Sequence, residues 1–462
     1  MARRNYLIEM RHILPWGIFI GMYEGAGSSI VVAKTFHGSE WLITIVMAIP
    51  TIANLMGLVW GSVAARRPKL PLFMLFGIGN VLLIGSVALT PQNEWGGWIF
   101  AGQIAVARTL LSGCVTVRSG LWKHNYPTQM RGRIAARIQI VRYSLGIGAV
   151  FFVSLLFDAN PAYYVYVYPA VALIGTLGLF QLRHLRVRGE KSALQAIRTP
   201  EASSNGLGRR LVGPIVDAYQ VLRDDAEYRR YCLGMMLLGT GNIMIFPVMA
   251  IMVTKELPLN YNHSTILLEV LPQFMMMVSM MAWAGLFDRR GVVRFRVLNA
   301  VTWAMASVFG GIAAAMMLLP ETFDTVWMFA VAITLVALSR GFEGLGRGGG
   351  AIGWNLGHLH FAEPAKADIY MGAHVFLTGI RGLTAPFMGT FFYKTLGPGV
   401  FAISATLGFL GMLTFRSLIK GDASSAFEPA GESAFEEPLP TEPAAPELGP
   451  TISRATISSR SR

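Results

Sequence analysis

Long apolar runs separated by short polar connections are the main pattern along this chain. A transmembrane helix needs about 20 consecutive apolar residues to cross roughly 30 Å of hydrocarbon. By this criterion the sequence contains about twelve candidate spans. They lie near residues 12–34, 41–64, 71–90, 98–117, 136–157, 163–182, 231–254, 264–286, 297–319, 325–350, 367–393 and 398–418. The pattern predicts an all-α membrane protein of about twelve transmembrane helices.

The spans divide into two sets of six, which predicts two pseudo-symmetric six-helix halves. The first half covers 1–182 and the second covers 231–420. Between them, 183–230 begins with a charged, small-residue stretch typical of a flexible cytoplasmic linker. Apolar residues spaced by three and four over 211–222 then predict an amphipathic helix, on the inner membrane face or against the cytoplasmic loops. Residues 421–462, rich in Glu, Pro, Ala and Ser, predict a disordered cytoplasmic tail.

Composition and charge placement also favour a membrane protein. Hydrophobic residues make up 53% of the chain and charged residues 14%, whereas soluble domains carry about 25% charged residues. The net charge of +13 is gathered in every second connection, a positive-inside pattern that places both termini in the cytoplasm. Nucleic-acid binding would instead need these cations on one folded face, so no nucleic-acid partner is expected. The cations are Arg3, Arg4, Arg11, Arg66, Arg67, Lys69, Lys123, Arg131, Arg133, Arg183, Arg186, Arg188, Arg289, Arg290, Arg294, Arg296 and Lys420.

Enzyme, metal and cofactor chemistry find no support in the sequence. There is no Walker motif and no nucleophile–base constellation, so neither hydrolysis nor ATP-driven pumping is predicted. His358 and His360 lie two residues apart and do not share a helical face, so they do not predict a metal site. Cys114 and Cys232 fall inside candidate spans and are interpreted as small packing residues. We expect no enzymatic activity, no metal and no cofactor.

Two short basic loops lie at equivalent places in the two halves. The first follows the second candidate span and runs from Gly61 through Arg66 and Arg67 to Lys69. It resembles the G-x3-D-R-x-G-R-K loop that the major facilitator superfamily carries between its second and third spans. Gly61 and Arg66 match this pattern, whereas Ala65 replaces the acid and Pro68 replaces the second glycine.

The second loop follows the eighth candidate span and resembles the weaker copy of the same motif that this family carries. Asp288, Arg289 and Gly291 match, whereas Ala284 stands in the place of the first glycine. Such a loop clamps the ends of neighbouring helices through charge and dipole contacts and so biases inward against outward states. The alternative is that these cations only fix the membrane topology.

The tenth candidate span carries a second resemblance to the family. Arg340, Glu343, Gly344 and Gly346 are similar to the family's R-x-x-Q-G-x-G pattern, which usually lies in span four and is linked there to proton coupling. In span four of this chain, Arg108 precedes Trp122 by the same interval as Arg340 precedes Trp354. This internal repeat supports a duplicated unit. The resemblance implies two six-helix halves and transport by alternating access, with spans one, four, seven and ten lining a central cavity.

Charged residues within the spans are the candidate functional residues. A charge near the middle of the bilayer is costly unless it faces protein or water. Glu24 lies in the first span beside glycines that allow another helix to approach closely. Because arginine is suited to carboxylate or phosphate, we expect an anionic or zwitterionic substrate, with Glu24 or Glu343 as the protonatable partner. The candidate substrate and proton-coupling residues are Glu24, Arg108, Arg142, Arg340, Glu343 and Arg381.

Other interpretations of these residues and of the whole chain stay open. The charged residues can be structural pairs that hold helices together. Glu269 can be a second coupling acid or a pairing residue beside a hinge, and His374 can be a packing residue or a proton relay. The expected function is secondary transport of a small solute. The alternatives are a non-transporting membrane receptor or scaffold and a lipid flippase on the same fold.

The expected setting is the bacterial cytoplasmic membrane, with the protein as an integral membrane monomer. Its expected partners are the lipid bilayer, a small-molecule substrate and protons.

Overall fold

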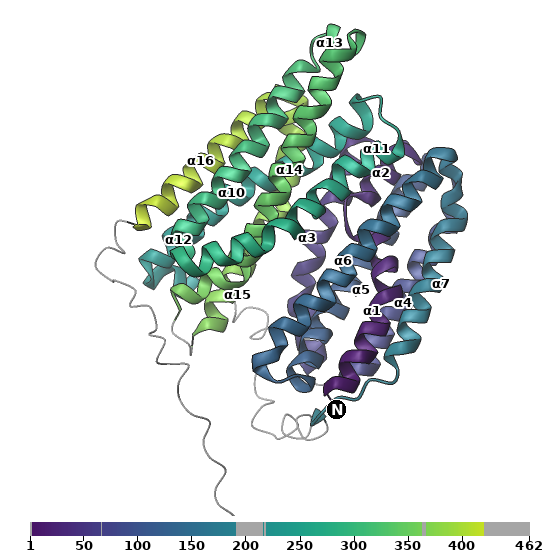
Figure 1. The fold of residues 1–462 in the computed structure, drawn as a ribbon, viewed down its shortest axis with the longest axis vertical. Coiled ribbons are helices and arrows are strands. Elements are labelled where there is room, and N and C mark those ends of the chain that lie inside the picture. Colours follow the sequence, from purple (N-terminus) through teal and green to yellow (C-terminus); the bar gives the residue numbers. More distant parts are fainter. Residues whose placement is uncertain (1, 66, 191–215, 217–218, 363–365, 420–462) are drawn as a thin grey trace, which may run out of the picture. The chain divides into compact units, whose positions relative to one another are not determined.

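The computed structural model describes residues 2–65, 67–190, 216, 219–362 and 366–419. Within these ranges the chain is built from helices and contains no strand (Figure 1). Most of the predicted amphipathic helix over 211–222 and all of the predicted tail over 421–462 lie outside the described residues.

The first half contains seven α-helices in the described ranges. They are α1 (Ala2–Glu24), α2 (Gly27–Lys34), α3 (Glu40–Ala65), α4 (Lys69–Gly85), α5 (Gly96–Asn125), α6 (Thr128–Ala159) and α7 (Tyr164–Leu182). Helix α1 packs against α6 and α7, and α5 packs against α3 and α4. The first predicted span is not one continuous helix, because it breaks at Gly25 and Ala26 between α1 and α2.

The second half of the described chain is also built from helices. They are α10 (Ala226–Ile251), α11 (Tyr261–Thr265), α12 (Leu271–Met316), α13 (Glu321–Asp324), α14 (Val326–Leu356), α15 (Ala367–Leu396) and α16 (Gly399–Ile419). Two π-helical segments, Met252–Glu256 and Ile266–Val270, follow α10 and precede α12. Helix α10 is buried along most of its length and packs against α15 and α16, whereas α12 packs against α14 and α16.

Helix α12 bends sharply at Gly291, in the second basic loop. Gly291 has φ 68° and ψ 170°, which is not helical. Residues with side chains rarely adopt this positive φ, so the glycine is required at this position. The two parts of α12, before and after Gly291, correspond to the eighth and ninth predicted spans.

Ten stretches of the described chain are helical, long and apolar enough to cross a membrane. The segment Tyr261–Met316 counts as one of them although Gly291 divides it. Helix α1 is not among the ten, and its first half carries the charged residues Arg3, Arg4, Glu9 and Arg11. The chain is an integral membrane protein of bundled helices.

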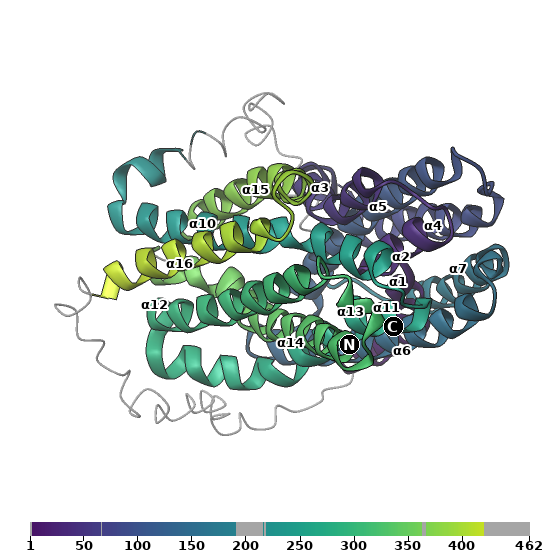
Figure 2. The same ribbon diagram turned by 90° about the horizontal axis from the view of Figure 1, so that it is seen from above.

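The hydrogen bonds between the two halves gather at one end of the bundle. The end of the bundle where α1 begins and where α3 meets α4 is called the basic end. The other end, which contains the connections 35–39 and 257–260, is called the opposite end, and these hydrogen bonds lie there. Helices α2 and α11 lie side by side there (Figure 2). Lys34 Nζ donates to the carbonyl oxygen of Leu259 at 2.5 Å, and Lys394 pairs with Glu40 at 2.7 Å.

The carboxylate of Asp158 adds a further contact at the opposite end. It accepts hydrogen bonds from the backbone nitrogens of Tyr261 at 2.5 Å and of Asn262 at 3.1 Å, across the boundary between the halves. The side chain of Thr35 also bonds to the hydroxyl of Tyr261. These contacts join the two halves at the opposite end.

Candidate functional site

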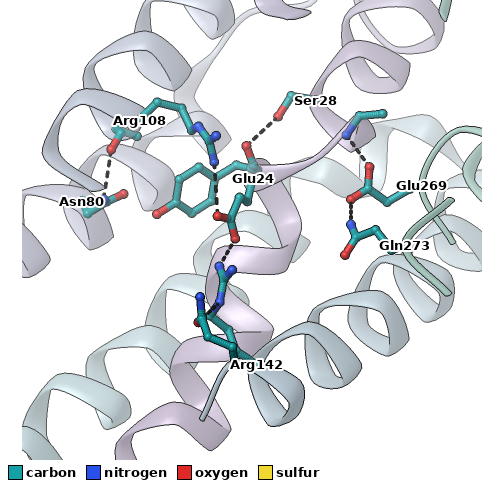
Figure 3. Close-up of polar contacts among 11 residues, drawn as sticks. Glu24, Ser28, Asn80, Arg108, Arg142, Glu269 and Gln273 are labelled. Carbon is teal, nitrogen blue, oxygen red and sulfur yellow. Dashed lines mark hydrogen bonds and ion pairs between the residues drawn. The ribbon is translucent and has the colours of Figure 1, made fainter. Parts of the chain in front are cut away.

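Three predicted residues from three helices meet where α1 ends. Glu24 is the last residue of α1, and its carboxylate forms an ion pair with Arg142 of α6. Arg108 of α5 approaches the same carboxylate, with 3.9 Å between Nη1 and Oε1 (Figure 3). The structure therefore brings Glu24, Arg108 and Arg142 together.

Glycines allow α1 and α6 to come close enough for this meeting. A Cβ on Gly17 would lie 3.2 Å from the Cα of Arg142, and one on Gly21 would lie 2.8 Å from the carbonyl oxygen of Gly146. Both distances are shorter than ordinary van der Waals contact. Close helix approach through small residues is typical of membrane proteins.

We expect Gly21→Ala to destabilise the protein by about 1–3 kcal/mol, because the added methyl group overpacks the contact with α6. The matched control is Gly148→Ala on α6, where an added Cβ meets nothing within 4 Å. This control should be neutral or gain up to about 1 kcal/mol, because alanine favours helix over glycine. Thermal unfolding in detergent compares the two variants. Equal effects would contradict the close packing at Gly21.

A cavity of about 230 Å³ lies between the two halves at this point. Its first-half walls come from α1, α5 and α6, and its second-half walls come from the π-helical segment Ile266–Val270, α12 and α14. The lining residues are Gly17, Gly21, Glu24, Gly25, Arg108, Arg142, Tyr143, Gly146, Glu269, Gln273, Met276 and Arg347.

The arginines of this cavity differ in how well they are paired. Arg142 pairs with Glu24, donates from Nε to Gln139 at 2.9 Å and lies 4.2 Å from the centre of the Tyr143 ring. Nη1 of Arg108 is buried and has no hydrogen-bond partner among the described residues. Arg108 is therefore the cavity arginine that is best able to bind an added anion.

Arg340 and Glu343 form a separate ion pair behind the cavity wall. Both side chains are almost fully buried, at 2% and 1% exposure. Arg340 also donates to the carbonyl oxygens of Leu267 at 3.2 Å and Leu268 at 3.1 Å, in the π-helical segment before α12. Glu343 pairs in addition with Arg347 at 2.6 Å. Neither Arg340 nor Glu343 is among the lining residues of the cavity.

Arg381 lies elsewhere in the second half. Its Nη1 donates to the carbonyl oxygen of Met235 at 2.6 Å, and its guanidinium packs over Gly239 of α10. It is not one of the lining residues of the cavity.

Glu269 connects the two halves at the break in the first span. The carboxylate accepts a hydrogen bond from the backbone nitrogen of Ala26 and another from the side chain of Gln273 (Figure 3). A Cβ on Gly25 would collide with this carboxylate. The sequence is compatible with Glu269 as a coupling acid or as a pairing residue, and the structure places it at the cavity and in a bond between the halves.

The basic loops are arranged differently from each other. In the first loop, Lys69 Nζ donates to the carbonyl oxygen of Ala64 at 2.5 Å and to that of Arg67 at 3.2 Å, which joins the end of α3 to the start of α4. Arg66 lies outside the described residues. In the second loop, Arg289 Nε donates to the carbonyl oxygen of Gly285 at 3.1 Å, within its own helix.

Sequence reasoning missed several cavity residues, of which Arg347 is the most important. Arg347 lies four residues after Glu343 on α14 and pairs with it at 2.6 Å. In the structure it reaches the cavity and lies 4.9 Å from the centre of the Phe246 ring. Tyr143, Gln273 and Met276 carry no charge, and no sequence signal distinguishes them from packing residues.

No protein-family model and no curated protein matches this sequence. Solved structures do match its fold. A point mutant of the nucleoside transporter NupG has a TM-score of 0.63 at 13% identity, over 90% of this chain and 99% of that one. The inward-open xylose transporter XylE from E. coli has a TM-score of 0.64 at 13% identity, over 91% and 96%.

A POT family transporter in complex with a thioalcohol-conjugated peptide matches with a TM-score of 0.58 at 12% identity, over 92% of this chain and 96% of that one. All three are transporters of the major facilitator type. The chain therefore has the fold of the major facilitator superfamily, as the basic loops and the pattern around Arg340 predicted.

Proposed function

We propose that this chain is a secondary transporter that carries a small anionic or zwitterionic solute by alternating access. The fold supports this class, and the cavity between the halves supplies a place for the solute. We count twelve spans in two six-helix halves by taking α1 with α2 as the first span. The two parts of α12, on either side of Gly291, are then the eighth and ninth spans.

We further propose that the basic end faces the cytoplasm, because its connections carry most of the cations. The closed opposite end then faces outward, and this conformation exposes the cavity toward the cytoplasm. In the outward-facing conformation the contacts of Lys34, Asp158 and Lys394 with the other half must open. The two basic loops, with Arg67 and Asp288, are proposed to bias the equilibrium between these conformations.

The buried Nη1 of Arg108, which lies 3.9 Å from the Glu24 carboxylate and makes no hydrogen bond with the described residues, is the observation that carries the substrate proposal. Buried polar groups are almost always hydrogen-bonded, so this nitrogen at the cavity wall can take a further acceptor as its partner. A carboxylate or phosphate oxygen supplies that partner and balances the charge. Arg347, on the facing wall, adds a second cation from the other half.

Glu24 is proposed to be the proton-coupling residue. Its side chain is 31% exposed at the cavity, whereas Glu343 is 1% exposed and held by two arginines. A proton can therefore reach Glu24 from the cavity. Protonation would neutralise Glu24 and break its ion pair with Arg142. The bound proton would therefore change the net charge of the cavity.

A thermal-shift screen against a library rich in anionic metabolites tests this proposal. We expect an anion to stabilise the wild type, because a ligand at about 100 times its Kd adds about 2.7 kcal/mol. Arg108→Ala should weaken that ligand by about 10- to 100-fold, since a hydrogen bond to a charged group is worth about 1.5–3 kcal/mol. Arg183→Ala, an exposed arginine at the basic end, is the charge-matched control. Equal stabilisation of Arg108→Ala, or stabilisation only by cations, would contradict the anion site.

A further inference from the structure

Glu269 of the second half has a buried carboxylate that forms a hydrogen bond with the first half. Its exposed fraction is 4%, and it lies in the π-helical segment Ile266–Val270. Its partner in the first half is the backbone nitrogen of Ala26, in the break between α1 and α2. The absence of a side chain on Gly25 leaves room for the carboxylate there.

Both oxygens of this carboxylate face N–H donors. Oε2 accepts from Ala26, and Oε1 accepts from Gln273. A protonated carboxyl group carries an O–H donor on one oxygen. A proton on either oxygen makes that oxygen a poorer acceptor and so weakens the hydrogen bond from Ala26 or from Gln273. The ionised form makes the stronger pair of hydrogen bonds, because bonds to an ionised acceptor are the stronger ones.

The surrounding charges come from both halves. On α14, Arg347 and Arg340 attract the Glu269 carboxylate, and Glu343 is paired with both arginines. On α1, Glu24 repels it.

The first-half helices α5 and α6 bring Arg108, Arg142 and Tyr143 to the same cavity. Glu269 itself lines this cavity, so a proton can reach it without the bundle unfolding.

The short helix α2 links Glu269 to the closed opposite end. It begins at Gly27, next to Ala26, and ends at Lys34. At its far end, Lys34 and Thr35 bond to Leu259 and Tyr261 of the second half. Eight residues of helix therefore join the bond at Glu269 to the contacts that close the opposite end.

We propose that Glu269 is a proton-controlled latch between the halves. When ionised, it holds the break between α1 and α2 and keeps the opposite end closed. When protonated, it releases Ala26, and the opposite end opens. This inference rests on the proposed alternating access and assigns its pH control to Glu269, separately from the proton that Glu24 is proposed to carry.

Distances between spin labels at the opposite end test this latch in the full-length protein. The native cysteines Cys114 and Cys232 are buried and are replaced by alanine. One label pair occupies the exposed positions Gln92 and Asp324. On moving from mildly alkaline to mildly acidic pH, the ratio of open to closed opposite end should rise about tenfold or more.

Two variants separate the latch from a general effect of pH. Glu269→Gln cannot ionise, so in this variant the ratio of open to closed opposite end should be high at both pH values and independent of pH. Gly25→Ala should give the same result while keeping Glu269, because the added Cβ displaces the carboxylate. The matched controls are Gly27→Ala, where a Cβ has its nearest neighbour at 3.8 Å, and Glu321→Gln, which removes an exposed carboxylate from α13. Both controls should keep the wild-type response.

A wild type whose opposite end does not respond to pH would overturn the latch. An unchanged pH response in both Glu269→Gln and Gly25→Ala would overturn it as well. A second label pair at Pro127 and Asn355, exposed at the basic end, separates this failure from that of the proposed function. If a stabilising anion increases the label distance at one end and decreases it at the other, but pH changes neither distance, alternating access is supported and the latch is contradicted. If pH opens the opposite end but no anion moves either pair, the latch stands and the proposed anionic solute is contradicted.

Discussion

Replacing Glu343 with alanine is expected to lower the stability of the protein by about 3–5 kcal/mol, which is typical of breaking a buried ion pair from one side. The change leaves Arg340 at 2% exposure without a counter-charge, and it removes the partner of Arg347. Arg340 also holds the carbonyl groups of Leu267 and Leu268, so the segment before α12 should loosen. Thermal unfolding in detergent measures the loss.

Two further variants show whether the role of this pair is structural. Glu321→Ala removes an exposed carboxylate from α13 and should leave stability almost unchanged. The double variant Arg340→Met with Glu343→Leu replaces the pair by apolar groups and should recover most of the stability, because such replacements are often neutral. A Glu343→Ala protein as stable as Glu321→Ala would contradict the structural role.

Glu24→Gln is expected to abolish proton-driven accumulation of the solute while exchange of solute across the membrane continues. Glutamine keeps the size of the side chain but cannot take up a proton, so the cycle loses its coupling and keeps its binding site. Uptake into proteoliposomes with an imposed pH gradient measures accumulation, and exchange without a gradient measures the remaining cycle. Glu321→Gln, at an exposed carboxylate of α13, is the matched control and should keep both activities. Unchanged accumulation in Glu24→Gln would show that the coupling proton binds elsewhere.

The fold could be predicted from the sequence because the bilayer imposes a length on each apolar run. This requirement is local, so the positions of most helices follow from windows of about 20 residues. The break at Gly25 and Ala26 was not predicted, because the apolar run continues through it. What stabilises the break is the carboxylate of Glu269, which lies 243 positions away in the sequence.

The candidate site was harder to predict, as Arg108 and Arg340 show. Both precede a tryptophan by the same interval, so the sequence pattern does not distinguish the role of one from that of the other. In the structure, Nη1 of Arg108 lies at the cavity and makes no hydrogen bond within the described chain, whereas Arg340 is enclosed by Glu343 and by two backbone carbonyl groups of another segment. Helical spacing predicts the face of the helix on which a residue lies. Whether the charge of that residue is paired depends on the groups that the neighbouring helix presents to it.

Entrance counterflow in proteoliposomes decides between a transporter and a non-transporting receptor on the same fold. Vesicles loaded with the library anion that gives the largest thermal shift are diluted into a trace of the labelled anion. We expect the wild type to draw the label inward transiently, and Arg108→Ala to show little or no uptake. Stabilisation by the anion without any counterflow in the wild type would show that the cavity binds its ligand but does not carry it across the membrane.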